Sequence, residues 1–148
     1  GQTFEENALI KARYVNKKTK KIAIADDSGL VIPILQGRPG IYSARFAGKN
    51  KNFNFAMKKV HNLLFKKKIN AYYISVLAIS WNRKKEKTFT GKIFGRLIWP
   101  PRGKLGFGYD PIFVPNGYSK TFGEIERDIK NKISHRAIAF KKFMKFLS

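Results

Sequence analysis

The 148-residue chain contains no cysteine, which excludes a disulfide framework, a thiolate nucleophile, cysteine-based zinc sites and iron–sulfur ligation. No apolar run reaches the ~18–20 residues that a membrane-spanning helix needs, and no secretory pattern follows Gly1. We therefore expect a cytoplasmic protein with no membrane partner. A chain of this length can bury roughly 68–70% of its unfolded surface without a metal or a disulfide, which predicts one domain over residues 1–148.

Acidic residues are also scarce, because 9 Asp and Glu stand against 31 Lys and Arg, for a formal net charge of +22. No carboxylate occurs between Asp27 and Glu86. The excess charge has two interpretations, a surface that binds polyanions and a drift of composition in which Lys, Asn, Ile and Phe are all frequent. The basic residues are spread along the whole chain, which favours drift, so we expect no specific nucleic-acid partner. The few carboxylates become the first candidates for function.

Hydrophobic periodicity and turn residues predict an α/β domain, with a mixed sheet and flanking helices. Thr3 and Glu6 have the spacing of a capping box and start an expected helix over 3–15. Ser134 is expected to cap the last helix. The other expected elements are strands over 22–25, 30–32, 71–81, 88–98 and 112–114, a helix over 53–66, and a short helix that follows a second capping-box spacing at 121–124.

The segment Asp26-Asp27-Ser28-Gly29 directly follows the strand expected at 22–25. Adjacent side chains at the end of a strand point to opposite faces, so one carboxylate can face a cleft. A carboxylate there could bind a metal ion and position a water molecule. Gly29 would permit a sharp change of chain direction. The same four residues are also typical of an Asx turn, and both interpretations stay open.

A second candidate, Gly106-Phe107-Gly108-Tyr109-Asp110-Pro111, alternates glycine with aromatic residues and then carries an acid. Glycines let the backbone approach a ligand closely, and aromatic rings can stack on a nucleobase. Asp110 could accept hydrogen bonds from the edge of a base. The alternative is a glycine-rich turn whose aromatic residues belong to the core.

Cations near the start of the last helix form a third candidate. With Ser134 at the N-cap, His135 and Arg136 fall in the first turn, where positive charge opposes the helix dipole. Unpaired N–H groups beside His135, Arg136 and Lys130 would bind an anion such as phosphate. The alternative is exposed charge at a frayed helix end. Lys11, on the first expected helix, could also contact a triphosphate.

Five segments taken together resemble the inosine triphosphate pyrophosphatase family, which hydrolyses non-standard purine nucleoside triphosphates. In the family's order and spacing they are TFEENALIKA (3–12), IADDSGL (24–30), PGIYSARFAG (39–48), GFGYDPIF (106–113) and KISHRAIA (132–139). The resemblance implies a homodimeric, magnesium-dependent enzyme with an elongated α/β fold and a central cleft. Its implied reaction converts dITP, ITP or XTP to the monophosphate and pyrophosphate.

The resemblance also implies a role for each candidate residue. Asp27 would be the catalytic proton acceptor and a ligand of Mg²⁺. The residues implied in substrate binding are Lys11, Ser28, Phe107, Gly108, Tyr109, Asp110, Lys130, His135 and Arg136. Of these, residues 107–110 would hold the purine, whereas Lys11 would reach the triphosphate.

The chain departs from the family at its start. In the family, a strand, a phosphate-binding loop with Gly-Asn and Lys, and a further acidic metal ligand precede the segment that begins here at Thr3. We therefore expect a fragment of a longer protein or the product of a decaying gene. Two alternatives to an active enzyme stay open: an inactive remnant of the pyrophosphatase, and a basic module that binds RNA or DNA without catalysis.

Overall fold

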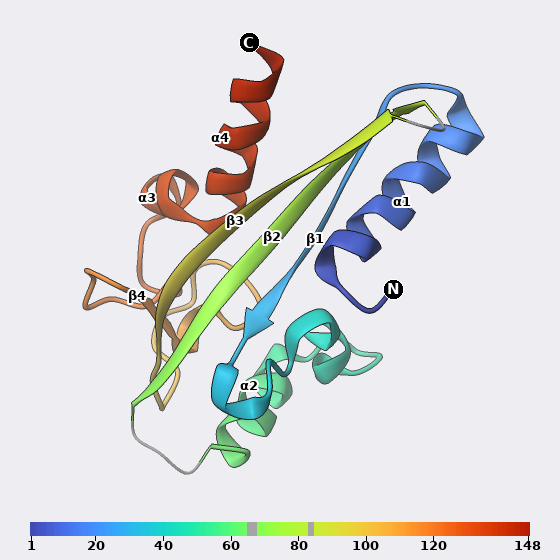
Figure 1. The fold of residues 1–148 in the computed structure, drawn as a ribbon. Helices are drawn as coiled ribbons and strands as arrows, with labels where there is room; N and C mark the ends of the chain where they lie inside the picture. Colours follow the sequence, from blue (N-terminus) through green and yellow to red (C-terminus); the bar gives the residue numbers. More distant parts are fainter. Residues whose placement is uncertain (65–67, 83–84) are drawn as a thin grey trace. The chain divides into compact units, whose positions relative to one another are not determined.

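The computed structural model describes residues 1–64, 68–82 and 85–148, which contain a sheet in the strand order β1-β2-β3-β4 (Figure 1). Strands β3 and β4 are antiparallel, and Gly95 is paired with Pro115. The expected α/β class, with helices flanking a sheet, is confirmed. The strands are β1 (Ala23–Val31), β2 (Ile69–Asn82), β3 (Lys85–Leu97) and β4 (Phe113–Pro115), and the helices are α1 (Phe4–Thr19), α2 (Phe53–Asn62), α3 (Arg127–Ile133) and α4 (His135–Leu147).

The chain forms two compact units, and each of the three long strands contributes to both. Unit 1 comprises Gly1–Ser28, Ile74–Lys92 and Ser134–Ser148, and unit 2 comprises Gly29–Tyr73 and Ile93–Ile133. The single domain and the central cleft stay predictions. Within the described residues, no helix is long and apolar enough to cross a membrane.

In unit 1, α1 and α4 pack on opposite faces of the strands. Ala12 of α1 is fully buried in a cluster with Val76 and Ala78 of β2. Phe143 of α4 is buried in a second cluster with Ile79. Because side chains alternate along a strand, the even positions of this part of β2 face α1 and the odd positions face α4.

Helix α4 approaches β3 so closely that only glycine fits at position 91. A Cβ atom there would lie 2.1 Å from the carbonyl oxygen of His135 and 2.5 Å from the backbone nitrogen of Ala139. We expect Gly91→Ala to lower the free energy of unfolding by about 1–3 kcal/mol, because the helix must move away from the strand. Urea unfolding checks this, with the exposed Lys85→Ala as the control on the same strand. An unchanged unfolding midpoint would show that α4 does not lie this close to β3.

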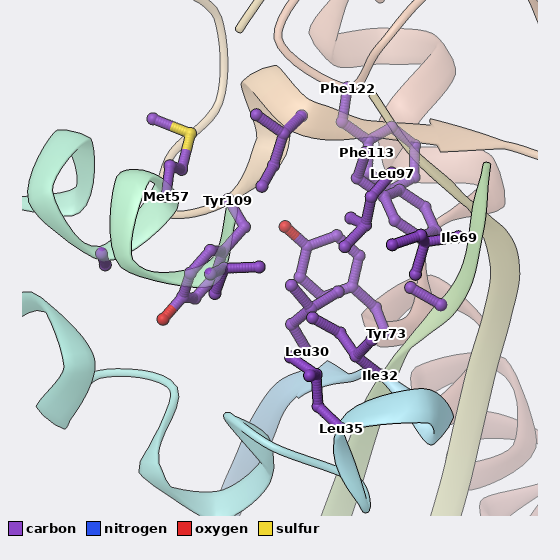
Figure 2. Packing of buried hydrophobic residues seen from close by; sticks show 14 of the residues in the cluster. Leu30, Ile32, Leu35, Met57, Ile69, Tyr73, Leu97, Tyr109, Phe113 and Phe122 are labelled. Atoms are coloured by element: carbon purple, nitrogen blue, oxygen red, sulfur yellow. The ribbon is translucent and has the colours of Figure 1, made fainter. Parts of the chain in front are cut away.

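Unit 2 holds the largest buried cluster, to which β1, β2, β3, β4 and α2 all contribute (Figure 2). Phe113 and Phe122 are fully buried, and the ring of Tyr73 lies 4.7 Å from that of Phe113. Tyr109 is also buried, and its ring meets that of Phe53 edge to face at 5.5 Å. Tyr73 and Tyr109 therefore each carry a hydroxyl group into an apolar region, where that group needs a hydrogen-bond partner.

A single strand, β1, replaces the two strands expected at 22–25 and 30–32. The predictions of an Asx turn at residues 26–29 and of a sharp change of chain direction at Gly29 are therefore wrong. Asp, Ser and Gly are poor strand formers, but β1 is hydrogen-bonded to β2, and pairing with a neighbouring strand overrides intrinsic preference.

The helix caps were predicted with more success. Thr3 Oγ1 accepts a hydrogen bond from the Glu6 N–H at 3.0 Å, and Ser134 Oγ accepts one from the Ala137 N–H at 3.2 Å, so both caps are confirmed. The second capping-box spacing, at 121–124, forms a turn, and α3 begins only at Arg127. The expected helix over 53–66 ends at Asn62, and its residues 65 and 66 lie outside the described residues.

Candidate active site

The side chains of Asp26 and Asp27 contact different helices of unit 1. Lys11 Nζ of α1 lies 3.0 Å from Asp27 Oδ1, and Arg136 Nε of α4 lies 3.5 Å from Asp26 Oδ2. Because the two residues are adjacent in a strand, their side chains point to opposite faces, one toward each helix. The Asp27 side chain is 20% exposed and that of Asp26 is 50% exposed. Asp27 is therefore the more enclosed carboxylate, and Asp26 is the one that Arg136 contacts.

Helix α1 holds Asp27 through two side chains that lie one helical turn apart. Besides Lys11, Asn7 Nδ2 donates to Asp27 Oδ2 at 3.4 Å. The Lys11 ammonium also donates to the backbone carbonyl of Asp26. Residues four apart share one face of a helix, so Asn7 and Lys11 approach β1 together. Both oxygens of Asp27 are thereby held in a defined orientation.

On the other face, Ser28 links Asp26 to the neighbouring strand. Ser28 Oγ lies 3.1 Å from Asp26 Oδ2 and 3.0 Å from the Oγ atom of Ser75 in β2. Ser75 is almost fully buried, and sequence reasoning did not single it out. The signal that could have identified Ser75 is its hydroxyl group within a mostly apolar strand.

The first turn of α4 is ordered by its Ser134 cap. His135 is buried, with 5% of its surface exposed, whereas Arg136 is exposed. The alternative of exposed charge at a frayed helix end is therefore wrong for His135. Arg136 extends its guanidinium group to β1, so a carboxylate and a helix N-terminus occur together in unit 1.

A magnesium ion could use the carboxylate oxygen atoms of Asp27. The described part of the chain has no cluster of three or more His, Cys, Asp or Glu side chains that could hold a metal. Mg²⁺ is usually held by one or two carboxylates together with water and substrate phosphates, so the carboxylate of Asp27 fits this ion, whereas that of Asp26 points to the other face of β1. Glu6 Oε2 accepts a hydrogen bond from the Gln2 N–H at 2.7 Å, which gives that carboxylate a structural use at the start of α1.

In unit 2, the aromatic residues of the 106–111 segment point in different directions. The Phe107 side chain is exposed, with 62% of its surface accessible, whereas Tyr109 is buried. Tyr109 Oη donates to the backbone carbonyl of Ser43 at 2.6 Å. Phe107 can therefore offer a flat face to a ligand, and Tyr109 supports the loop from within the core, as the turn interpretation expects.

Burial raises the pKa of the Tyr109 hydroxyl group. The folded protein thus disfavours its ionisation, so this contribution to stability is present below the ordinary pKa of about 10 and is lost as the pH rises through the folded value. We expect Tyr109→Phe to cost about 0.5–1.5 kcal/mol at neutral pH through the lost hydrogen bond to Ser43. The difference between the proteins should shrink above pH ~10.

Urea unfolding at neutral pH and above pH ~10 checks this prediction, with Tyr118→Phe as the control at an exposed tyrosine. A difference between wild type and Tyr109→Phe that stays constant across the alkaline range would contradict it.

Asp110 organises the same loop through three hydrogen bonds. Its Oδ1 atom accepts from Tyr73 Oη at 3.1 Å, and its Oδ2 atom accepts from the Phe107 N–H at 3.0 Å and from Lys130 Nζ at 2.5 Å. The side chains of Lys130 and Asp110 are 13% and 4% exposed, so this is a buried ion pair. Protein donors occupy both carboxylate oxygens, and the expected contact of Asp110 with the edge of a base stays a prediction.

The ammonium group of Lys130 also lies over two aromatic rings. Its Nζ atom is 4.7 Å from the centroid of Phe107 and 5.4 Å from that of Phe122. The loop needs glycine at 106, because φ is +71° and a Cβ atom would lie 2.1 Å from Asp110 Oδ2. A cation, an exposed ring and a buried carboxylate thus form one connected group in unit 2.

Comparison with known proteins adds the family. Residues 1–146 match the Ham1 family. This chain belongs to the Ham1 family. It is 47% identical over 148 residues to the dITP/XTP pyrophosphatase of Zymomonas mobilis, covering 97% of this chain and 71% of that protein. It is 48% identical over 150 residues to the dITP/XTP pyrophosphatase of Bacillus subtilis, covering 99% and 76%.

A solved structure has the same fold. The Ham1 protein of Staphylococcus aureus superposes with a TM-score of 0.93 at 39% identity, covering 99% of this chain and 77% of that one. The resemblance that the five sequence segments indicated is confirmed.

The predicted site residues of this Ham1 chain are distributed over both units. In unit 1, Lys11 lies beside Asp27 on one face of β1, whereas Arg136 and Ser28 lie beside Asp26 on the opposite face. His135 is buried at the start of α4. Unit 2 brings together the predicted residues of the 106–111 segment and Lys130. Their roles in catalysis and binding stay predictions, and Asn7, Tyr73 and Ser75 are the partners that sequence reasoning did not identify.

Proposed function

We propose that this chain hydrolyses non-standard purine nucleoside triphosphates, such as dITP, ITP and XTP, to the monophosphate and pyrophosphate. The observation that carries the proposal is the enclosed carboxylate of Asp27, held by Lys11 and Asn7, in a chain with dITP/XTP pyrophosphatases among its relatives. The groups of unit 1 suit phosphate chemistry, and those of unit 2 suit recognition of a base.

Attack of water on a nucleotide phosphorus requires positioning and neutralisation of charge more than covalent help from the protein. In the proposed reaction, Asp27 accepts a proton from the attacking water. The water oxygen bonds to phosphorus while the bond to the departing pyrophosphate breaks. Lys11, on the same face of β1 as Asp27, offers positive charge to the phosphate oxygens, and Arg136 and the capped N-terminus of α4 offer it on the other face.

The proposal includes Mg²⁺, with Asp27 as a ligand. Bound to phosphate oxygens, the ion would supply Lewis-acid neutralisation of the charge on the triphosphate. The carboxylate of Asp27 provides the hard oxygen ligand that this ion prefers. Removal of divalent cations with a chelator should abolish turnover, and excess Mg²⁺ should restore it.

Recognition of the base is assigned to unit 2. The exposed ring of Phe107 can stack on a purine, and the ammonium group of Lys130 beside it can only donate hydrogen bonds. Such a donor suits the 6-oxo group of hypoxanthine or xanthine and does not suit the 6-amino group of adenine. Backbone N–H groups near Tyr109 are further candidate donors. Selection against adenine follows, because a mismatched pair leaves buried polar groups unsatisfied.

The remaining parts of the proposal come from the family resemblance and from composition. We propose a homodimer in the cytoplasm. A competing function, non-catalytic binding of RNA or DNA, is favoured only by the net charge of +22. It predicts binding to a random oligonucleotide that weakens steeply with salt, and no turnover.

Pyrophosphate release from dITP, XTP, ITP, ATP and GTP, measured with Mg²⁺, tests the proposal. We expect rates on the 6-oxo substrates dITP and XTP to exceed those on ATP by at least about 10–100-fold, since a missing hydrogen bond in a built site is strongly discriminating. Equal rates on all five nucleotides, or no release above the uncatalysed background, would contradict the proposed function.

A further inference from the structure

We propose that Tyr73 is a positioning residue of the base-recognition loop. Its hydroxyl group fixes the Asp110 carboxylate, and this carboxylate in turn fixes the backbone at Phe107 and the ammonium group of Lys130. The inference rests on the proposed function, because it assigns to Tyr73 a part in nucleotide binding. Neither the sequence motifs nor the family resemblance pointed to this residue.

A buried hydrogen bond joins Tyr73 to Asp110. Tyr73 Oη lies 3.1 Å from Asp110 Oδ1, and both residues are buried. A hydrogen bond to a buried charged group is among the stronger ones in proteins, because neither partner can exchange it for water. Tyr73 is on β2 and Asp110 follows the glycine-rich loop, so the contact ties that loop to the central sheet.

The two carboxylate oxygens of Asp110 accept hydrogen bonds from different donors. Oδ2 accepts from both the Phe107 N–H and Lys130 Nζ, while Oδ1 accepts from Tyr73. The terminal torsion of an aspartate side chain has a broad energy minimum, so the carboxylate can rotate when it is held at one oxygen alone. With Tyr73 at Oδ1, the plane of the carboxylate is set, and Oδ2 points where Phe107 and Lys130 need it.

The ring of Tyr73 is itself held by aromatic neighbours. Its ring lies 4.7 Å from the ring of Phe113 and 6.1 Å from that of Phe122, within the buried cluster (Figure 2). Phe122 is also one of the two rings beneath Lys130. Replacing Tyr73 with Phe keeps these ring contacts and removes only the hydroxyl group, so the variant isolates the positioning effect.

Because Tyr73 is buried and acts through Asp110, it should affect binding of the nucleotide more than the chemical step. We expect Tyr73→Phe to raise KM for dITP by about 5–20-fold with kcat changed less than about twofold, which is the signature of binding lost equally in the ground state and the transition state. Tyr118→Phe, which removes an exposed hydroxyl of unit 2, is the matched control and should change neither constant.

Hydrogen exchange of the Phe107 amide, measured by NMR, gives a readout that does not depend on turnover. This amide donates to Asp110, whereas the Phe122 amide donates to the Phe113 carbonyl at 2.9 Å and reports on the core. In Tyr73→Phe, we expect faster exchange at Phe107 and little change at Phe122. Unchanged exchange at Phe107 would overturn the proposal, as would equal acceleration at both amides with an unchanged KM, which indicates general destabilisation.

The two measurements separate this inference from the proposed function. If the wild-type protein releases no pyrophosphate from dITP or XTP, the proposed function is wrong, and so is the part of Tyr73 in positioning the loop for nucleotide binding. The exchange at Phe107 then still decides whether the hydroxyl group holds the loop. If wild type turns over dITP and Tyr73→Phe leaves KM and the Phe107 amide unchanged, only the inference about Tyr73 is wrong.

Discussion

Asp27→Asn is expected to lower kcat for pyrophosphate release from dITP by about 10²–10⁴-fold, the usual contribution of a positioned general base. Asparagine has nearly the same shape, and its single side-chain oxygen can still accept a hydrogen bond from Lys11, while its NH2 group replaces the oxygen that accepts from Asn7, so the protein should remain folded. It cannot take a proton from water, and it lacks the charge that would hold a divalent cation. Steady-state kinetics with a pyrophosphate-coupled assay measure the change, and dITP binding should persist.

Asp26→Asn is the informative comparison for this prediction. Asp26 is one residue away but contacts Arg136 on the other face, and it is more exposed. We expect a smaller loss of activity, through looser positioning of Arg136. Asp128→Asn, in the exposed first turn of α3, controls for loss of an acidic charge and should be neutral. Near-normal turnover of Asp27→Asn, or a larger loss in Asp26→Asn, would remove Asp27 from the centre of the mechanism.

Asp110→Ala is expected to lower the free energy of unfolding by about 3–5 kcal/mol, the cost of leaving one member of a buried ion pair without its partner. Lys130 would keep its charge in a region where only 13% of its side chain is exposed. The variant also leaves Tyr73 Oη and the Phe107 N–H without an acceptor. Urea unfolding at neutral pH measures the loss.

Two further variants make this prediction specific. The double variant Asp110→Ala/Lys130→Met should recover part of the loss, because the unpaired buried charge is gone. Glu86→Ala breaks the exposed pair with Arg13 and should cost less than about 1 kcal/mol. A loss for Asp110→Ala no larger than that for Glu86→Ala would show that the Asp110–Lys130 pair is not buried.

The Glu86 comparison should be made at neutral pH. The hydrogen bond from Arg13 lowers the pKa of Glu86 from its ordinary 4.5. A lowered folded pKa means that the contribution is present above the ordinary value and is lost as the pH falls through the folded one. In acid, the small difference between wild type and Glu86→Ala should therefore disappear.

Local sequence signals predicted the starts of the first and last helices, because caps depend on residues three positions apart, but they misplaced the start of α3. Thr3 and Ser134 behave as expected, and the five segments quoted for the family resemblance indicated the correct family. The continuity of β1 could not be read in this way. Asp26–Gly29 have the composition of a turn, and only pairing with β2, which lies some forty residues further along the chain, keeps them extended.

The supporting residues of the site were missed for a related reason. Ser75 and Tyr73 are ordinary residues of an apolar strand, and their partners Ser28 and Asp110 are 47 and 37 residues away. Both are odd-numbered positions of β2, so alternation places them on one face of the strand. A polar group repeated on a buried face is the pattern that would have singled them out.

The identity of the phosphorus-containing products tests the central claim most directly, and ³¹P NMR of dITP incubated with the protein and Mg²⁺ measures it. The mechanism at Asp27 predicts dIMP and pyrophosphate in equal amounts from the wild type, and at least about 100-fold less of both from Asp27→Asn over the same initial period. Formation of dIDP with inorganic phosphate, or the same yield of pyrophosphate from Asp27→Asn, would contradict it.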